Sequence, residues 1–436
     1  MKKNIFNALI GFAALAVSLA SCQRMDYPDR FVQTSGVPTV DYIRYASQDV
    51  FITQAYMDEL VCIVGSNLTS VHDIYFNDQK AILNTGYITA NTLLVAVPSQ
   101  QAVEKTDKIY LITKDGASVS VDFKVLPPAP KISSMSNEYA AAGTTATITG
   151  KYFMDVTAFE FSGAAVTDYT IVDAEHISFK VPEGAVEGPL YIETASGSGY
   201  SKFYYKDSRG MMFDFDTPNP VTGVVLDKNG WNSHMSTTDD TALSGNFFVF
   251  GALDGSQAMS SWNEEFSFPY WPGDTWGDTE YFETHPRLND VIDVTGWASK
   301  ALKFEMYIPT DHPWSDGIMQ ICFAGIDQVT GAGAAVTVDG KPCAGANNTY
   351  FSSEVNPRAR YAPWTSGGSY DTGNEWVTVT LPLATDFVYT FSGANCDKSM
   401  DDSSFASLWI FIVSGTPAGT ECSPVIKLDN IRIAAY

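Results

Sequence analysis

The feature that most restricts the fold of this chain is a repeat of small, strand-rich units in its first half. Each unit has a β-rich run that reaches a glycine, an aromatic residue eleven positions later, and then a Val-Pro pair. The pattern occurs at Gly65, Phe76 and Val97-Pro98, and again at Gly150, Phe161 and Val181-Pro182. The offset of about 85 residues is the length of a small β-sandwich rather than of a solenoid repeat. The sequence therefore predicts two consecutive sandwiches of short strands.

This repeat resembles the IPT/TIG immunoglobulin-like domain, in which the strand with its glycine and the later Val-Pro pair recur. The second copy fits better, because the first has Leu68 where an aromatic residue is usual. We expect the two domains at residues 37–127 and 128–206, joined by the proline-rich segment 126–130, which favours a stiff, extended backbone. Neither copy contains a tryptophan or a cluster of titratable residues, which favours a role as spacers.

The composition changes after the second copy, since all nine tryptophans lie beyond residue 230. Alternating or continuous apolar runs predict further strands at residues 302–308, 318–323, 377–383, 408–413 and 425–434. No segment has a convincing helical pattern. We predict an all-β chain: two immunoglobulin-like (IPT/TIG) β-sandwiches followed by a larger jelly-roll-like β-sandwich at residues 207–436. Its first strand, near residues 212–216, and its last, near 428–433, are expected to be neighbours.

An aromatic-rich stretch of the third region, residues 262–282, is the strongest indication of a binding site. It contains eight aromatic residues among twenty-one, interrupted by proline, glycine and aspartate, which predicts that much of it is surface loop. Exposed rings on a loop can cover the C–H face of a sugar while nearby polar groups bond its hydroxyls. The candidates in this stretch are Tyr270, Trp271 and Trp276. The alternative is that these rings form a small core beneath a long loop.

Three further tryptophans lie in turn-like segments and are candidates for sugar contacts: Trp231, Trp314 and Trp364. Three others begin or lie within predicted strands and are expected to pack in the core: Trp297, Trp376 and Trp409.

The charge of the chain restricts its partners. The net charge is −24, which repels phosphate backbones and excludes nucleic acid as a natural ligand. A neutral glycan meets no such repulsion.

Metal and cofactor motifs are sparse. No Cys-x-x-Cys spacing indicates zinc, and we expect no cofactor, although Asp214, Asp216 or Asp429 could hold a structural Ca²⁺. Cys62 is predicted to be a buried free thiol. Four cysteines of the last third could form up to two disulfides in three connectivities: Cys322, Cys343, Cys396 and Cys422.

The N-terminus has the form of an export signal. Lys2 and Lys3 precede an apolar stretch over residues 5–20, which is short for a membrane-spanning helix. The segment 19–22 ends in Cys22 and resembles a bacterial lipobox, which implies a signal peptide over 1–22 and a lipid on Cys22. Residues 23–36 are expected to be a tether.

In its whole architecture the chain resembles the surface glycan-binding lipoproteins of Bacteroidota polysaccharide-utilisation systems, with a xyloglucan- or β-glucan-binding C-terminal domain. The resemblance implies non-catalytic binding of a polysaccharide on the outside of the outer membrane, beside a glycan transporter complex.

The residues themselves leave two alternative functions open. A hydrolase or lyase would need paired carboxylates, and several acidic residues lie near the aromatic stretch: Glu264, Glu265, Asp274, Asp278 and Glu280. A surface adhesin would use the aromatic residues to bind a protein partner.

Overall fold

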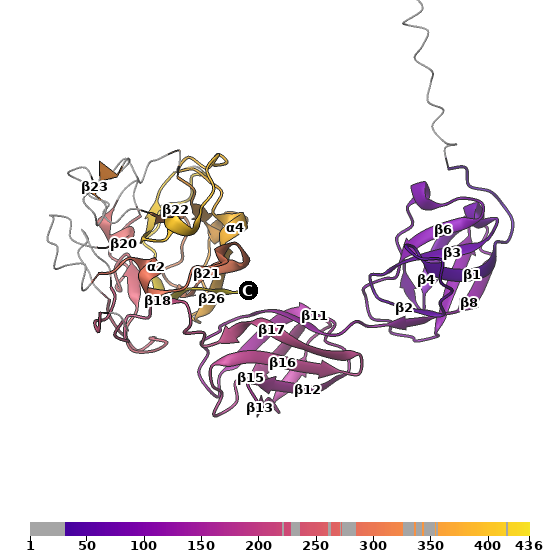
Figure 1. Ribbon diagram of the computed structural model, residues 1–436, viewed down its shortest axis with the longest axis horizontal. Coiled ribbons are helices and arrows are strands. Elements are labelled where there is room, and N and C mark those ends of the chain that lie inside the picture. Colours follow the sequence, from indigo (N-terminus) through magenta and orange to yellow (C-terminus); the bar gives the residue numbers. More distant parts are fainter. Residues whose placement is uncertain are drawn as a thin grey trace, which may run out of the picture. The chain divides into compact units, whose positions relative to one another are not determined.

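The computed structural model describes residues 31–219, 222–227, 236–259, 263–270, 272, 285–325, 335–336, 342–343, 354, 356–415 and 417–436. Strands predominate in these residues, and the helices are single turns, so the all-β prediction is confirmed (Figure 1). The chain divides into two compact units between Pro128 and Ala129. The signal segment, Cys22 and most of the tether lie outside the described residues. Among the described helices, none is long and apolar enough to cross a membrane.

The first unit is a β-sandwich whose two main sheets have the strand orders β1-β3-β6 and β5-β4-β7-β8, with a small parallel pair, β2-β9. Ile63, Ile74 and Leu111 come from both sheets and are fully buried between them. The strands are β1 (Thr39–Tyr45), β2 (Gln54–Tyr56), β3 (Leu60–Ser66), β4 (Val71–Phe76), β5 (Gln79–Lys80), β6 (Thr92–Ala96), β7 (Lys108–Thr113), β8 (Ser118–Asp122) and β9 (Lys124–Leu126).

A second sandwich begins the second unit and repeats this plan, with sheets ordered β10-β11-β15-β14 and β13-β12-β16-β17. Phe159, Phe161 and Phe179 meet in its core with ring centroids 4.9–6.2 Å apart. The strands are β10 (Lys131–Met135), β11 (Thr145–Lys151), β12 (Val156–Phe161), β13 (Ala164–Ala165), β14 (Tyr169–Ile171), β15 (His176–Lys180), β16 (Gly188–Thr194) and β17 (Gly197–Tyr205).

The repeated glycine has a structural cause in both sandwiches. A Cβ atom at Gly65 would lie 1.9 Å from the carbonyl oxygen of Thr39, and one at Gly150 would lie 2.0 Å from that of Lys131. In each case the glycine pairs with the preceding strand at a break in register. The conserved geometry of the two copies therefore requires a residue without a side chain at this bulge.

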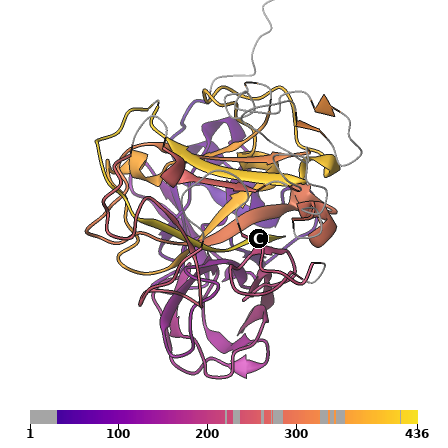
Figure 2. The same ribbon diagram turned by 90° about the vertical axis from the view of Figure 1, so that its left-hand side faces the viewer.

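The part of the second unit that follows the second sandwich, called here the C-terminal domain, has two main sheets that share one core (Figure 2). One has the order β18-β28-β21-β26, with β19 also paired to β28, and the other has the order β20-β27-β22-β25. The strands of these two sheets are β18 (Met211–Phe213), β19 (Phe248–Phe250), β20 (Ser267–Tyr270), β21 (Lys300–Tyr307), β22 (Ile318–Ala324), β25 (Ala359–Tyr361), β26 (Val377–Pro382), β27 (Ser407–Val413) and β28 (Ile426–Ala435). A separate pair consists of β23 (Ala335–Val336) and β24 (Pro342–Cys343). Two one-turn helices are α2 (Leu288–Val291) and α4 (Leu383–Asp386). The strands predicted here are confirmed, and the first and last strands, β18 and β28, are antiparallel neighbours.

The cysteines of this domain correct one prediction. Cys322, Cys396 and Cys422 are free thiols, so no disulfide joins these three, and the side chain of Cys343 lies outside the described residues. Cys322 is buried in the central strand β22 opposite Trp409, where it packs as a small apolar residue. The predicted buried free thiol at Cys62 is confirmed.

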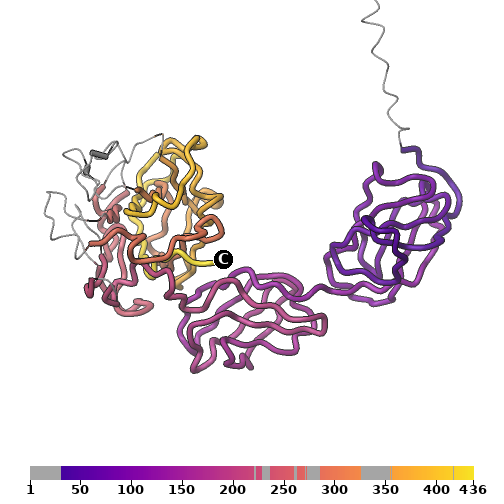
Figure 3. The backbone as a smooth tube through the Cα atoms, in the orientation of Figure 1, coloured from indigo at the N-terminus to yellow at the C-terminus, as the bar shows by residue number. Residues whose placement is uncertain are grey.

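The second sandwich and the C-terminal domain belong to one compact unit, in which they lie next to each other (Figure 3). The amide of Thr378 in the edge strand β26 donates to the carbonyl oxygen of Ser136 (2.8 Å), and the amide of Glu138 donates to Thr378 Oγ1 (2.7 Å). The backbone of Gly210 lies close to that of Ile433. A Cβ atom at position 210 would be 1.9 Å from the Ile433 carbonyl oxygen. The C-terminal strand therefore packs against the entry to its own domain.

Four buried charges lie at this junction. Arg432 donates from Nη1 to Glu305 Oε2 (2.8 Å) and from Nη2 to Glu138 Oε2 (2.8 Å), and Lys303 Nζ donates to Glu138 Oε1 (2.6 Å). All four residues are at most 1% exposed. Burial raises the pKa of Glu305 and lowers that of Lys303; although burial opposes it, the two glutamates hold the pKa of Arg432 above its usual range. Glu138 belongs to the second sandwich, so the network holds the two domains together.

We predict that Arg432→Met lowers the free energy of unfolding by about 3–5 kcal/mol, because it leaves two buried carboxylates without their shared cation. Denaturation followed by tryptophan fluorescence measures this, since every tryptophan lies in the C-terminal domain. Lys180→Met is the control: its ion pair with Asp168 on the second sandwich is solvent-exposed, and its removal should change nothing measurable. Equal stability of Arg432→Met and the unmodified protein would contradict this role for the network.

Candidate functional site

Three of the six aromatic residues predicted to bind sugar are core residues instead. Tyr270 and Trp314 are fully buried, and Trp364 is 4% exposed. Each uses its polar group internally: Tyr270 Oη donates to the carbonyl oxygen of Pro286 (2.8 Å), Trp314 Nε1 to that of Asp316 (2.6 Å), and Trp364 Nε1 to that of Gly317 (2.7 Å). A buried indole or phenol needs such a partner, and the folded loops supply it. Tyr270, which was expected on an exposed loop, therefore lies in the core, and the candidates Trp314 and Trp364 lie in the core as well.

The sequence contained a signal for the burial of Tyr270. Phe266, Phe268 and Tyr270 alternate with period two, which is the pattern of a strand with one face in the core. The structure has this strand as β20 at the edge of its sheet, paired with β27. Pro269 is compatible with that position because an edge strand can lose an amide donor. The neighbouring prolines also favour a loop, and this masks the alternation in the sequence.

The other three candidates, Trp231, Trp271 and Trp276, lie outside the described residues and remain predictions. The three tryptophans expected to pack are confirmed: Trp376 and Trp409 are buried, and Trp297 packs against the main core.

The calcium site suggested for Asp214, Asp216 and Asp429 is not supported. No group of three or more His, Cys, Asp or Glu in the described ranges is arranged to hold a metal ion. Asp214 instead accepts the backbone amides of Asp216 (3.1 Å) and Thr217 (2.9 Å), and Asp216 accepts two hydrogen bonds from Asn246. These carboxylates shape a turn.

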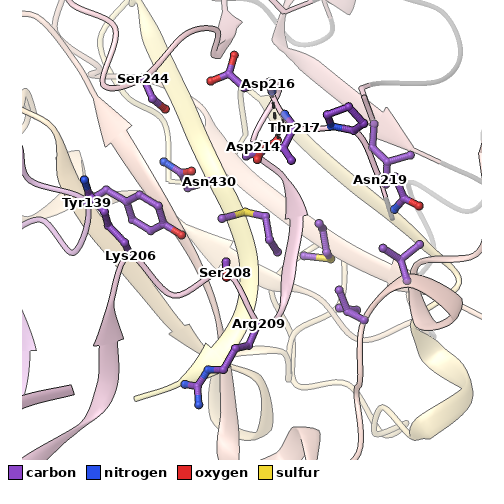
Figure 4. Close-up of a pocket in the computed structure, with 16 residues that line it drawn as sticks. Tyr139, Lys206, Ser208, Arg209, Asp214, Asp216, Thr217, Asn219, Ser244 and Asn430 are labelled. Atoms are coloured by element: carbon purple, nitrogen blue, oxygen red, sulfur yellow. Dashed lines mark hydrogen bonds between the residues drawn. The ribbon is translucent and has the colours of Figure 1, made fainter. Parts of the chain in front are cut away.

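A cavity of about 560 Å³ opens between the second sandwich and the C-terminal domain. We call it the junction pocket. Its ionisable and polar lining includes Tyr139, Lys206, Arg209, Asp214, Asp216, Asn219, Ser244 and Asn430, and its apolar lining includes Met211, Met212, Leu226, Val291 and Ile292. Figure 4 shows Asp214, Asp216 and Thr217 grouped together, with Arg209 at another end of the pocket. The volume lies within the range of about 300–1,000 Å³ typical of small-molecule sites.

The walls of the junction pocket are held by internal bonds. Arg209 makes two hydrogen bonds of 2.8 Å to the buried Asp207 and lies over the ring of Tyr204, 3.5 Å from its centroid. Tyr139 Oη donates to the carbonyl oxygen of Asp207 (2.7 Å), and the Arg432 guanidinium lies 4.8 Å from the Tyr139 ring centroid. The pocket is thus built on the same contacts that join the two domains.

Asp429 lies behind this pocket and is fully buried. Burial raises its pKa to about 9, and the nearby carboxylates of Glu305, Asp216 and Asp214 act in the same direction. Its Oδ1 accepts the amide of Asn430 (2.7 Å). At neutral pH this carboxyl is therefore protonated and does not add to the negative charge of the site.

Comparison with known proteins identifies the family. The profile of the surface glycan-binding protein B xyloglucan binding domain matches residues 205–435, more than half of the chain. The chain belongs to the surface glycan-binding protein B family. It is 42% identical to surface glycan-binding protein B of Prevotella bryantii, over 92% of this chain and 99% of that one, with a TM-score of 0.73. The predicted family resemblance is confirmed.

Two further relatives are more distant. An IPT/TIG domain-containing protein of Bacteroides ovatus is 25% identical over 249 residues, which is 51% of this chain. The chain spans about half the length of that relative, 49%. A surface glycan-binding protein B from a complex xyloglucan utilisation locus of Bacteroides uniformis covers 92% of this chain at 15% identity with a TM-score of 0.41.

Membership of the surface glycan-binding protein B family answers two questions that the residues left open. The chain is a glycan-binding protein and not an enzyme, so the carboxylates near the aromatic stretch need no catalytic role. A polysaccharide is its ligand, which fits a chain of strongly negative charge.

We expect the free energy of unfolding to decline as pH rises from about 4 to about 9 through the contribution of Asp429. In that window the unfolded chain has lost the Asp429 proton, whereas the folded protein keeps it until the pKa of about 9. The contribution amounts to about 1.4 kcal/mol per pH unit. Asp429→Asn keeps an acceptor for the Asn430 amide but cannot ionise, so its pH profile should be flatter.

Denaturation midpoints at several pH values measure this difference, with the exposed Asp240→Asn as control. Parallel profiles for Asp429→Asn and the unmodified protein would mean that Asp429 is already ionised in the folded state.

Proposed function

We propose that this chain binds xyloglucan or a related β-glucan on the bacterial cell surface, without cleaving it. The observation that carries the proposal is the match of the xyloglucan-binding-domain profile to residues 205–435, which span the entire C-terminal sandwich. The match to the surface glycan-binding protein of Prevotella bryantii, which extends over 92% of this chain, supports the same assignment.

The proposed ring platform consists of Trp271 and Trp276, with Trp231 as a further contact. The burial of Tyr270, Trp314 and Trp364 leaves these three as the candidates from the sequence. Flat indole rings suit a repeating polymer, because each can cover the C–H face of one sugar unit.

Native gels that contain soluble polysaccharides test both the ligand and the platform. The mature protein should be retarded by xyloglucan or another β-glucan without shortening the polymer, and Trp271→Ala should lose most of that retardation. Tyr87→Ala is the matched control, since Tyr87 is 57% exposed on the first sandwich and should leave the retardation unchanged. Absence of retardation in every glycan would contradict the proposed ligand. Equal retardation of Trp271→Ala and the unmodified protein would contradict the proposed ring platform.

The first two sandwiches are proposed to be spacers between a lipid anchor on Cys22 and the glycan-binding domain, with the lipid in the outer membrane and the protein facing outwards. In this arrangement the protein passes polysaccharide to an outer-membrane glycan transporter complex. The supporting observations are the lipobox-like sequence and the surface glycan-binding family.

Cell fractionation and surface labelling test the anchor. The unmodified protein should accumulate in the outer membrane and be labelled from outside, whereas Cys22→Ser should leave that fraction, because one lipidated cysteine is the only anchor we propose. Co-purification of a transporter from detergent-solubilised membranes tests the partner. Membrane retention of Cys22→Ser would contradict lipidation at this residue.

A further inference from the structure

Three of the eleven non-glycine residues that have left-handed backbone conformations in the described part of the chain lie at or beside the junction pocket. Lys206 (φ 51°), Phe215 (φ 59°) and Asn430 (φ 51°) all have left-handed backbone conformations. Lys206 and Asn430 line the pocket, and Phe215 lies between its two lining aspartates. Such conformations disfavour non-glycine residues, most of all bulky ones. Strain that the surrounding structure maintains tends to mark sites of function.

An unsatisfied amide lies in the pocket wall. Asn430 is 2% exposed, and its Nδ2 has no hydrogen-bond partner among the described residues. A buried donor without a partner destabilises the folded state. A hydroxyl group that enters the pocket beside Asn430 would satisfy it.

The charges that line the pocket leave a small negative excess. Lys206 and Arg209 line it together with Asp214 and Asp216, and the charge of Arg209 is already compensated by Asp207. The negative excess disfavours a phosphate or a polyanion, and no described group of ligands is arranged for a metal ion. A neutral ligand with several hydroxyls can instead bond to carboxylates and amides together.

The apolar lining of the pocket provides the second kind of surface that a sugar needs, one for its C–H groups. Met211, Met212, Leu226 and Ile292 offer a surface for C–H groups beside the polar cluster. A pyranose has both kinds of surface, which is the combination that small-molecule sites use to fix orientation.

We propose that the junction pocket binds a neutral pyranose unit, as a second contact for the polysaccharide that the C-terminal domain holds. The inference rests on the proposed function for the identity of the polymer. In it, Asn430 Nδ2 donates to a sugar hydroxyl, and Asp214 and Asp216 accept from others. Two contacts on one polymer raise its overall affinity even if the second alone is weak.

Methionine methyl NMR tests the pocket directly, because Met211 and Met212 line it and report on it independently of the ring platform. The mature protein, labelled on its methionine methyl groups, is titrated with D-xylose, D-glucose and a xylogluco-oligosaccharide. Assignment uses Met211→Leu and Met212→Leu. We expect saturable shifts of these two signals with at least one sugar, while the other methionine signals stay in place.

Two variants separate a ligand site from a structural feature. Thr217→Trp places a large side chain at an exposed position of the pocket rim and should abolish the shifts, whereas the matched Thr385→Trp on α4 should not. Asn430→Gly removes the amide, relieves the left-handed strain and keeps the carbonyl oxygen that Arg432 binds. It should weaken sugar binding by roughly three- to tenfold, the effect of one hydrogen bond, with unchanged or higher thermal stability.

The outcomes distinguish this proposal from the function on which it rests. No shift of Met211 or Met212 at saturating sugar, with normal retardation in glycan gels, overturns the pocket and leaves the proposed function intact. Shifts caused by calcium chloride but not by sugars also overturn it. Shifts with xylose or glucose but no retardation by any polysaccharide would support the pocket and contradict the polymer-binding role.

Discussion

The pairing of Arg432 with Glu138 and Glu305 is the interaction on which the glycan-binding half of the molecule depends. Arg432 is fully buried in the last strand, β28, and Glu138 comes from the second sandwich. Ionised groups are stable in such a place only when their partners are fixed. The fold of the C-terminal domain is therefore tied to the presence of its neighbour, and the junction pocket lies beside this network, since Arg432 packs against the ring of Tyr139 in the pocket wall. A domain regarded as a simple spacer contributes part of the structure that surrounds the ligand-binding domain.

Much of the fold could be predicted from local patterns. The two copies of the repeat share a glycine because neighbouring backbone leaves no room for a Cβ atom, as at Gly65 and Gly150. The strands of the C-terminal domain were visible as alternating or continuous apolar runs, because their burial is a property of successive residues. The fusion of two domains could not be predicted in this way. Glu138 and Arg432 are separated by almost 300 residues, and nothing in either local sequence shows that the two side chains meet.

The site was harder to predict than the fold for a related physical reason. Trp314 and Trp364 lie in turn-like sequences, yet their indole N–H groups bond to backbone carbonyls of a single loop and their rings cover the core. Whether a loop tryptophan faces solvent or the core depends on whether the folded loop offers such an acceptor, and composition does not reveal that. Nothing in the sequence marks Asn430, because its left-handed backbone and its unpaired amide are properties of the folded chain.

Pro269 in the edge strand β20 also affects whether a strand of another chain can pair with this edge of the sheet. On the membrane anchor proposed above, copies of the protein would meet one another, and exposed sheet edges are where identical chains join into extended ladders. Proline offers no amide hydrogen, so an incoming strand finds a gap in the donor row of this edge. The other sheet's edge strand, β26, is covered in part by Ser136 of the second sandwich. Crowding at the surface can therefore raise the local concentration of binding sites without promoting self-association through these two edges.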